Sequence, residues 1–290
     1  MSELRELKVD NRRGNKNYKI VVEKYNSAQE MVRDCDTRTM TDSCFTDQRK
    51  KSYDSWEGVK SYQEALDLLS NGYQPSVDKL KSRLKTSAMG NGKRITFRND
   101  IVGYAPIVPL AIQGVPQSMI NHSMKPIKAK VLDIYYDMTC SYRTSSNTII
   151  ECGRKVLSVI LDLESQGYRV NLYGVQSYSG SESADIVCVK VKSANQPIDL
   201  KRVSFPLTHT AFFRVIGFDW YSKCPKAKYR CGYGHALYYD YRDNMKKLQE
   251  MIREIFDCKQ AVYISASQIQ HSGEDWLKGV IIDESGNGKR

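Results

Sequence analysis

Strand and helix patterns alternate through the second half of this chain. An apolar strand pattern covers 129-AKVLDIYYD-137, a helical pattern follows over residues 146–166, and a second strand pattern covers 168-YRVNLYGVQSY-178. This order predicts a βαβ unit, in which a helix packs on a parallel sheet. We therefore expect residues 128–290 to form an α/β domain with three layers and a mostly parallel sheet.

The remaining patterns continue this alternation. We predict a strand over 184–193, a helix from near Thr208, an amphipathic helix over 242–257, a strand over 261–267 and a short final strand over 279–283.

The first 127 residues differ in character. Residues 1–50 carry many charges and few apolar side chains, which predicts a basic, polar arm. Residues 51–127 predict a helical and irregular region, with helices within 59–73 and 76–87. Three prolines interrupt the apolar stretch 104–119, so we expect a buried irregular connection there.

Bulk composition limits the class of protein. With 41% hydrophobic residues the chain can bury a core, and no run approaches the roughly 18–20 apolar residues of a membrane span. The N-terminus lacks the apolar segment of a secretory signal, so we expect an unexported protein that does not contact a membrane. The formal net charge of +11 favours an anionic partner such as nucleic acid.

Two basic stretches are candidates for nucleic-acid or anion binding. The first begins on the polar face of helix 76–87 and continues beyond it, and it comprises Lys79, Lys81, Arg83, Lys85, Lys93 and Arg94. The second interleaves cations and rings that could stack on single-stranded nucleic acid, and it comprises Lys226, Lys228, Tyr229, Arg230 and Tyr233. The alternatives are a solvated helix face for the first stretch and ordinary packing for the second.

A candidate metal site follows the strand 129–137. Asp137, Thr139 and Ser141 alternate at the carboxyl end of this strand, where parallel sheets place their ligands. One carboxylate and two hydroxyls supply the hard oxygen ligands that suit Mg²⁺ or Mn²⁺. Two alternatives remain open: a turn that caps the following helix, or an anion site at that helix N-terminus.

The sequence D-M-T-C-S at 137–141 resembles the D-x-S-x-S motif of the metal-ion-dependent adhesion site in the von Willebrand factor A-like fold, with Thr139 in place of the first serine. The resemblance implies a threonine from a second loop, for which Thr208 and Thr210 are candidates. It also implies an aspartate after a later strand, but Ser265 or Ser267 stands there. The metal site that it implies is therefore degenerate.

Three further segments resemble an uncharacterised family of bacteriophage and prophage proteins. They are the W-E-G-x-x-S-Y pattern within 56–73, the proline-rich 108–119 and F-P-L-T-H-T-A-F-F-R at 205–214. The resemblance implies a viral protein of a phage or mobile element, located in the cytoplasm of the bacterial host or associated with the virion. It supplies no catalytic residues.

These observations favour a non-enzymatic binding or scaffold protein with a protein partner. No nucleophile and base, and no carboxylate cluster, occur at a recognisable spacing, so neither catalysis nor a small-molecule substrate is expected. The alternative is a nucleic-acid-binding accessory protein that acts through its basic and Tyr-rich surfaces.

Overall fold

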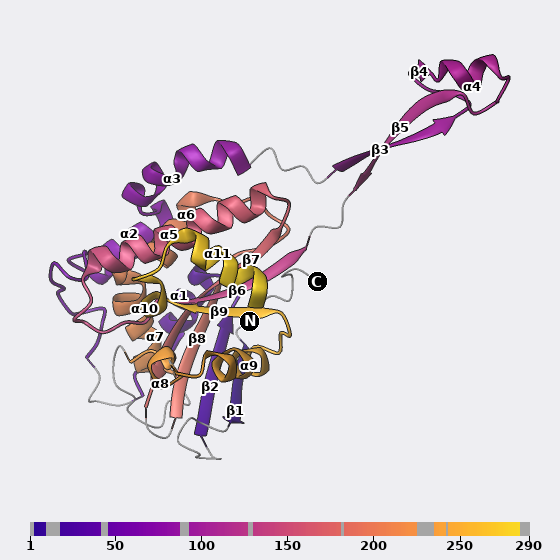
Figure 1. Cartoon of the computed structure of the whole chain (residues 1–290). Helices are drawn as coiled ribbons and strands as arrows, with labels where there is room; N and C mark the ends of the chain where they lie inside the picture. The colour runs from indigo at the N-terminus through magenta and orange to yellow at the C-terminus, as the bar shows by residue number, and fades with distance from the viewer. Residues whose placement is uncertain are drawn as a thin grey trace.

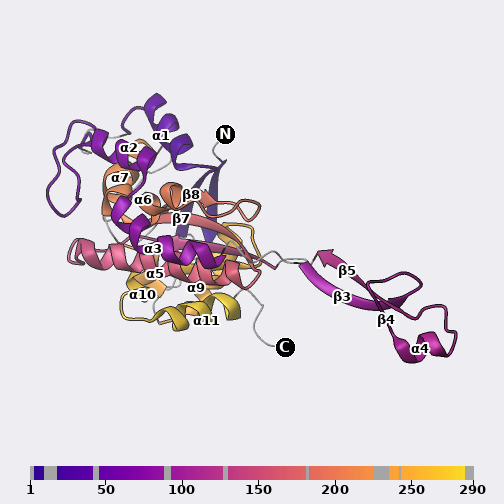
Figure 2. The ribbon, with the colours of Figure 1, turned by 90° about the horizontal axis from the view of Figure 1, so that it is seen from above.

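The computed structural model describes residues 3–9, 18–41, 46–87, 93–126, 130–180, 183–224, 235–241 and 243–284. These residues form an α/β body and a slender arm, residues 93–126, which projects away from the body (Figure 1). Figure 2 shows the same projection from above.

A six-stranded sheet forms the centre of the body, in the order β1-β2-β8-β7-β6-β9. The strands are β1 (Glu3–Val9), β2 (Tyr18–Tyr25), β6 (Val131–Asp137), β7 (Arg169–Ser179), β8 (Ser183–Lys192) and β9 (Ala261–Ser265). Three pairs are parallel, β2–β8, β7–β6 and β6–β9, whereas β1–β2 and β8–β7 are antiparallel. The prediction of a mostly parallel sheet in an α/β fold is therefore confirmed.

Helices cover both faces of this sheet, which gives the body three layers. Along β6, Ile134 and Tyr136 belong to one hydrophobic core and Tyr135 to the other, because successive side chains of a strand point to opposite faces. The first core receives α1 (Ala28–Thr37), α2 (Tyr62–Asn71), α3 (Gln74–Ser87), α5 (Ser146–Ser165), α6 (Leu200–Thr208), the π-helical turn η1 (Phe212–Ile216), α7 (Gly217–Lys223), α10 (Ala266–Ile269) and α11 (Glu274–Glu284). The second core receives α8 (Leu237–Tyr241) and α9 (Met245–Ile255).

Helix α5 is capped by the loop that precedes it and packs closely against α6. The Ser145 hydroxyl caps the helix by accepting a hydrogen bond of 3.2 Å from the Thr148 amide. At Gly153, an added Cβ would lie 1.9 Å from the Leu207 carbonyl oxygen, so glycine permits the close approach of α5 and α6. Helix α5 is thereby capped at its start and packed closely against α6.

The N-terminal segment differs from the polar arm expected over residues 1–50. Strands β1 and β2 join the sheet, and Ile20 of β2 is fully buried. One charged pair of this segment lies inside the body: Arg38 donates to both carboxylate oxygens of the buried Glu23, and the Trp220 indole donates to the same carboxylate at 2.7 Å. The many charged residues of this segment therefore did not mean that the whole segment is exposed to solvent.

Two further predictions are wrong. Residues 279–283 lie in helix α11, not in a strand, because Leu277 and Ile281 are four residues apart and both face the first core. Residues 104–119 are not buried but form the outer part of the arm. The predicted boundary at residue 128 lies outside the described residues.

The arm is a small antiparallel sheet with a helical turn at its tip. It comprises β3 (Lys93–Asp100), β4 (Ala105–Pro106), α4 (Val108–Ile112) and β5 (Met119–Pro126). The strand order is β3-β5-β4, and the arm sheet is separate from the sheet of the body. Strand β3 is therefore an edge strand.

Candidate functional site

Asp137 ends β6 and is fully buried between two parallel neighbours, β7 and β9. Its Oδ1 accepts a hydrogen bond of 2.9 Å from the Thr139 amide. Its Oδ2 accepts from the Ser177 hydroxyl at 2.5 Å and the Tyr263 hydroxyl at 2.6 Å. Burial raises the pKa of Asp137, and these hydrogen bonds partly oppose that rise. Both carboxylate oxygens thus have protein donors.

The hydroxyls of Thr139 and Ser141 stabilise the loop locally. Thr139 Oγ1 accepts a hydrogen bond of 2.9 Å from the Ser177 amide, which ties the loop to β7. Ser141 Oγ accepts from the Arg143 amide at 3.3 Å, two residues on. Together with the Ser145 cap, these contacts form a turn that leads into α5. This is the arrangement expected from the alternative prediction, in which the motif is a turn that caps the following helix.

The threonines of the second loop lie on a different side of the sheet from Asp137. Thr208 Oγ1 donates to the Ser204 carbonyl at 2.8 Å, and Thr210 Oγ1 donates to the Glu57 carbonyl at 2.9 Å. Their neighbours Leu207 and Ala211 belong to the first core, whereas Tyr263, which bonds Asp137, belongs to the second. The structure therefore does not bring these threonines to the Asp137 carboxylate.

The other expected position of the adhesion-type site holds a buried serine. Ser265 pairs with Asp137 in the sheet register, and its hydroxyl accepts a hydrogen bond of 3.3 Å from the Ser267 amide at the start of α10. Across the described ranges, no group of three or more His, Cys, Asp or Glu side chains is arranged to hold a metal ion.

A buried arginine, which the sequence patterns did not single out, lies against the same loop. Arg214 in η1 is 7% exposed, and its Nη2 donates a hydrogen bond of 2.7 Å to the Cys140 carbonyl. Its guanidinium lies 4.8 Å from the centre of the Trp56 ring and also contacts the rings of Phe213 and Phe218. Burial lowers the pKa of Arg214. The only sequence signal for it is a single cation within the apolar run 211-AFFRVIGF-218.

The described part of the first basic stretch is engaged in surface ion pairs. Lys79 lies 3.2 Å from Glu151, and Lys81 lies 2.6 Å from Asp78. Arg83 and Lys85 fall in α3, and Lys93 and Arg94 fall in β3, but their side chains are outside what the structure describes. The second stretch, with Lys226, Lys228, Tyr229, Arg230 and Tyr233, lies outside the described residues.

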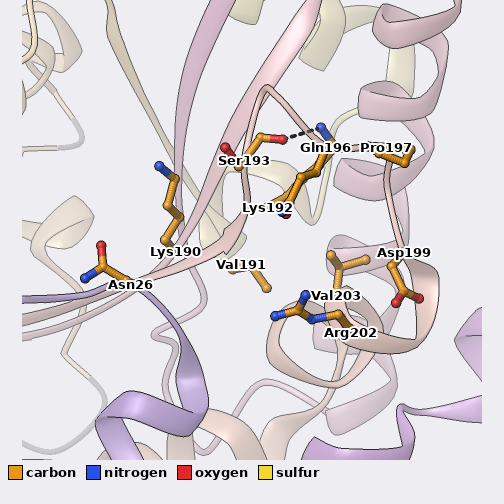
Figure 3. A pocket seen from close by; sticks show the side chains of 10 residues that line it. All are labelled: Asn26, Lys190, Val191, Lys192, Ser193, Gln196, Pro197, Asp199, Arg202 and Val203. Carbon is orange, nitrogen blue, oxygen red and sulfur yellow. Dashed lines mark hydrogen bonds between the residues drawn. The ribbon is translucent and has the colours of Figure 1, made fainter.

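A small polar pocket of about 100 Å³ lies where β8 ends and α6 begins (Figure 3). The side chain of Lys192 is buried there, and its ammonium group lies 2.5 Å from the Glu164 carboxylate. Lys190 and Arg202 also line the pocket, together with the carboxylate of Asp199. These charged side chains do not supply a nucleophile with a neighbouring base.

The arm holds most of the exposed large hydrophobic side chains of the described chain. Seven of the eleven lie there: Phe97, Ile101, Val102, Tyr104, Val108, Ile112 and Val115. Ile112 is the most exposed, at 81%, and it lies four residues after Val108 on the same side of α4. Exposed apolar side chains that gather on one segment in this way mark a candidate interaction site.

The arm has two chemically different faces and no core of its own. Arg98 pairs with Asp100 at 2.8 Å on one face, whereas Phe97 lies opposite His122 on the other face, where Tyr104 packs on His122 at 5.3 Å. No residue from 97 to 122 is buried, and the sequence from 101 to 121 contains no Asp, Glu, Lys or Arg. The tip is thus an uncharged apolar surface on a strongly basic chain.

Comparison with known proteins finds a match to a protein family that is described as a domain of unknown function, over residues 8–281. The matched range includes both the body and the arm. No curated protein and no solved structure matches the chain. None of the helices that the structure describes has the length and apolar character needed to cross a membrane.

Proposed function

Since the chain belongs to the family Domain of unknown function (DUF7192), which carries no assigned activity, we propose from its surface that it is a non-enzymatic binding or scaffold protein. The arm is the binding surface, and the observation that carries this proposal is its uncharged, exposed apolar tip. Water contact with so many apolar side chains is unfavourable, and a protein partner that covers them removes this cost.

The absence of a core within residues 97–122 supports the same function. A small sheet without buried side chains is marginally stable in water, because little apolar burial offsets the entropy lost on ordering it. A partner that packs on Phe97, Tyr104 and Ile112 provides the missing buried contacts. Binding and ordering of the arm are then coupled.

For the body we propose a von Willebrand factor A-like domain with a degenerate metal-ion site. The support is the D-M-T-C-S loop at the end of β6, which has parallel neighbours on both sides, and the engagement of both Asp137 oxygens by protein donors. The proposal of a phage or prophage origin is supported by the sequence resemblance alone.

Nucleic-acid binding has less support among the described residues. Lys79 and Lys81, the described members of the first basic stretch, are paired with carboxylates, and the arm tip offers no cation to a phosphate. We therefore place binding at the arm and a protein in the role of partner.

Site-specific photo-crosslinking in cells that produce the full chain tests this function. A crosslinking amino acid at Ile112 is expected to give a discrete protein adduct, and the same probe at Met40, an exposed apolar position on the body, is expected to give none. The Ile112 adduct should disappear when Phe97→Asp is added. Equal adducts from both positions, or none from Ile112, would reject the arm as a binding surface.

A further inference from the structure

We infer that the partner of the arm is the arm of a second copy of this chain. This inference rests on the proposed binding function of the arm, and it names the partner. It follows from the chemistry of the tip, from the surface of the body and from the direction in which the arm projects.

The chemistry of the tip favours a protein over an anionic partner. Nucleic acids and anionic membranes are held by unpaired Lys and Arg side chains. Residues 101–121 contain none, and Arg98, the described cation next to the tip along β3, is already paired with Asp100. The partner surface that complements the uncharged apolar tip is therefore itself uncharged and apolar.

The described surface of the body offers no such match. Its exposed large hydrophobic residues are Met40, Val131, Tyr142 and Trp276, which belong to four different segments: the end of the α1 region, the start of β6, the loop before α5, and α11. Isolated apolar residues of this kind are ordinary surface features. Within an assembly of identical chains, the surface that complements an arm is therefore another arm.

Two-fold symmetry suits the pairing of two arms. In a symmetric dimer the same patch meets itself, and the uncharged tips bring no like charges together. The net charge of +11 on each chain opposes close contact between the bodies, whereas the arm reaches away from its body (Figure 2). Contact at the arms keeps the two bodies apart.

The available apolar area is of the right order for a small, specific interface. Burial of each of the seven exposed side chains removes roughly 60–120 Å² from water, at about 25 cal/mol per Å². The seven side chains together supply roughly 420–840 Å² per partner, against the roughly 800 Å² per partner of a standard interface.

Sedimentation equilibrium of the full chain, over a wide range of protein concentration, tests this inference. The wild type is expected to reach twice the 33.2 kDa of one chain. Ile112→Asp and Phe97→Asp should each weaken the dimer at least tenfold, whereas the matched control Met40→Asp should leave it unchanged. Thermal unfolding of the arm variants should match wild type, because neither residue contributes to a core of the body.

Several outcomes would overturn the inference. A monomer at every concentration, or a dimer that survives both arm substitutions, excludes arm-to-arm pairing. If the chain is monomeric and the Ile112 crosslink joins it to a protein of another mass, the binding function stands and the second copy is excluded. If monomeric wild type, but not Ile112→Asp, sediments with phosphatidylcholine vesicles, the occupant is lipid. A monomer without any Ile112 adduct rejects both proposals.

Discussion

Tyr263 on β9 donates a hydrogen bond of 2.6 Å to Oδ2 of Asp137 at the end of β6, and both side chains are fully buried. Ser177 on β7 donates to the same oxygen, so the carboxylate ties together three adjacent strands. The Ser177 hydroxyl in turn accepts a hydrogen bond of 2.9 Å from the Leu237 amide at the start of α8. Asp137 therefore orders the carboxyl edge of the sheet and one helix of the second core.

The first prediction concerns this network. Asp137→Ala leaves the Ser177 and Tyr263 hydroxyls and the Thr139 amide without their acceptor, and each buried unsatisfied group costs about 1–3 kcal/mol. We expect Asp137→Ala to lower the free energy of unfolding by several kcal/mol in a denaturant titration. Asp137→Asn keeps an acceptor for Thr139 and removes the buried charge, so its loss should be clearly smaller. Equal losses for the two variants would contradict the assigned hydrogen bonds.

The second prediction concerns metal dependence. Because protein donors engage both Asp137 oxygens, the thermal midpoint of the wild type should be the same in chelator and in excess Mg²⁺ or Mn²⁺. A bound ion at a hundred times its dissociation constant would stabilise the fold by about 2.7 kcal/mol and shift the midpoint by several degrees. Such a shift in wild type, together with its loss in Asp137→Asn, would show instead that D-M-T-C-S binds a cation.

The third prediction concerns acid stability. Burial lowers the pKa of His209 to about 4, and its Nδ1 accepts a hydrogen bond from the Ala211 amide. The unfolded chain takes up a proton at this histidine near pH 6.5, while the folded chain does not, so stability is complete above that pH and declines as the pH falls from 6.5 to 4. The contribution of His209 to this decline is about 3 kcal/mol. Unfolding free energies of wild type and His209→Asn, measured over this range, should show a smaller decline in the variant. Identical slopes would mean that His209 is already protonated in the folded state.

The fourth prediction concerns Arg214. The Arg214→Met side chain keeps an apolar stem of similar length among Trp56, Phe213 and Phe218, and it loses the hydrogen bond to Cys140. Replacing a buried charge by an apolar group of similar volume is often neutral, so we expect a loss of at most about 1–2 kcal/mol. Arg214→Ala removes the packing as well and should lose about 3 kcal/mol or more. If the two variants lose equal stability, the guanidinium and not the stem provides the stabilisation.

Some of this architecture could be predicted from the sequence, and some could not. The apolar strand pattern of residues 129–137 and the helical pattern of 146–166 predicted β6 and α5, because each element buries its apolar residues. The antiparallel direction of β8 could also be predicted from the sequence. Only five residues separate the predicted strands that end at 178 and start at 184, which is too few for a crossover to a parallel strand.

The arm and the buried arginine could not be predicted by the same reasoning. Apolar side chains are ordinarily buried and charged ones exposed, so 104–119 indicated a core segment and Arg214 carried no special signal. The arm and Arg214 both depart from this pattern, because the arm exposes Ile112 and Arg214 lies beneath aromatic rings. Likewise, the positions of Thr208 and Thr210 depend on which face of the sheet their helix covers, which a local motif does not contain.

The last prediction is that the body folds without the arm. Lys93 and Pro126 are register partners at the base of the arm, so roughly 5 Å separates their Cα atoms and a linker of a few Gly and Ser residues can replace 93–126. Because neither core of the body contains a residue from 93 to 126, we expect the free energy of unfolding to stay within about 0.5 kcal/mol of wild type. Denaturant unfolding, followed by tryptophan fluorescence, measures this directly, since Trp56, Trp220 and Trp276 all lie in the body. The shortened chain should be monomeric. A large loss of stability would show that the arm contacts the body of its own chain, which would remove the reason to expect a partner at its tip.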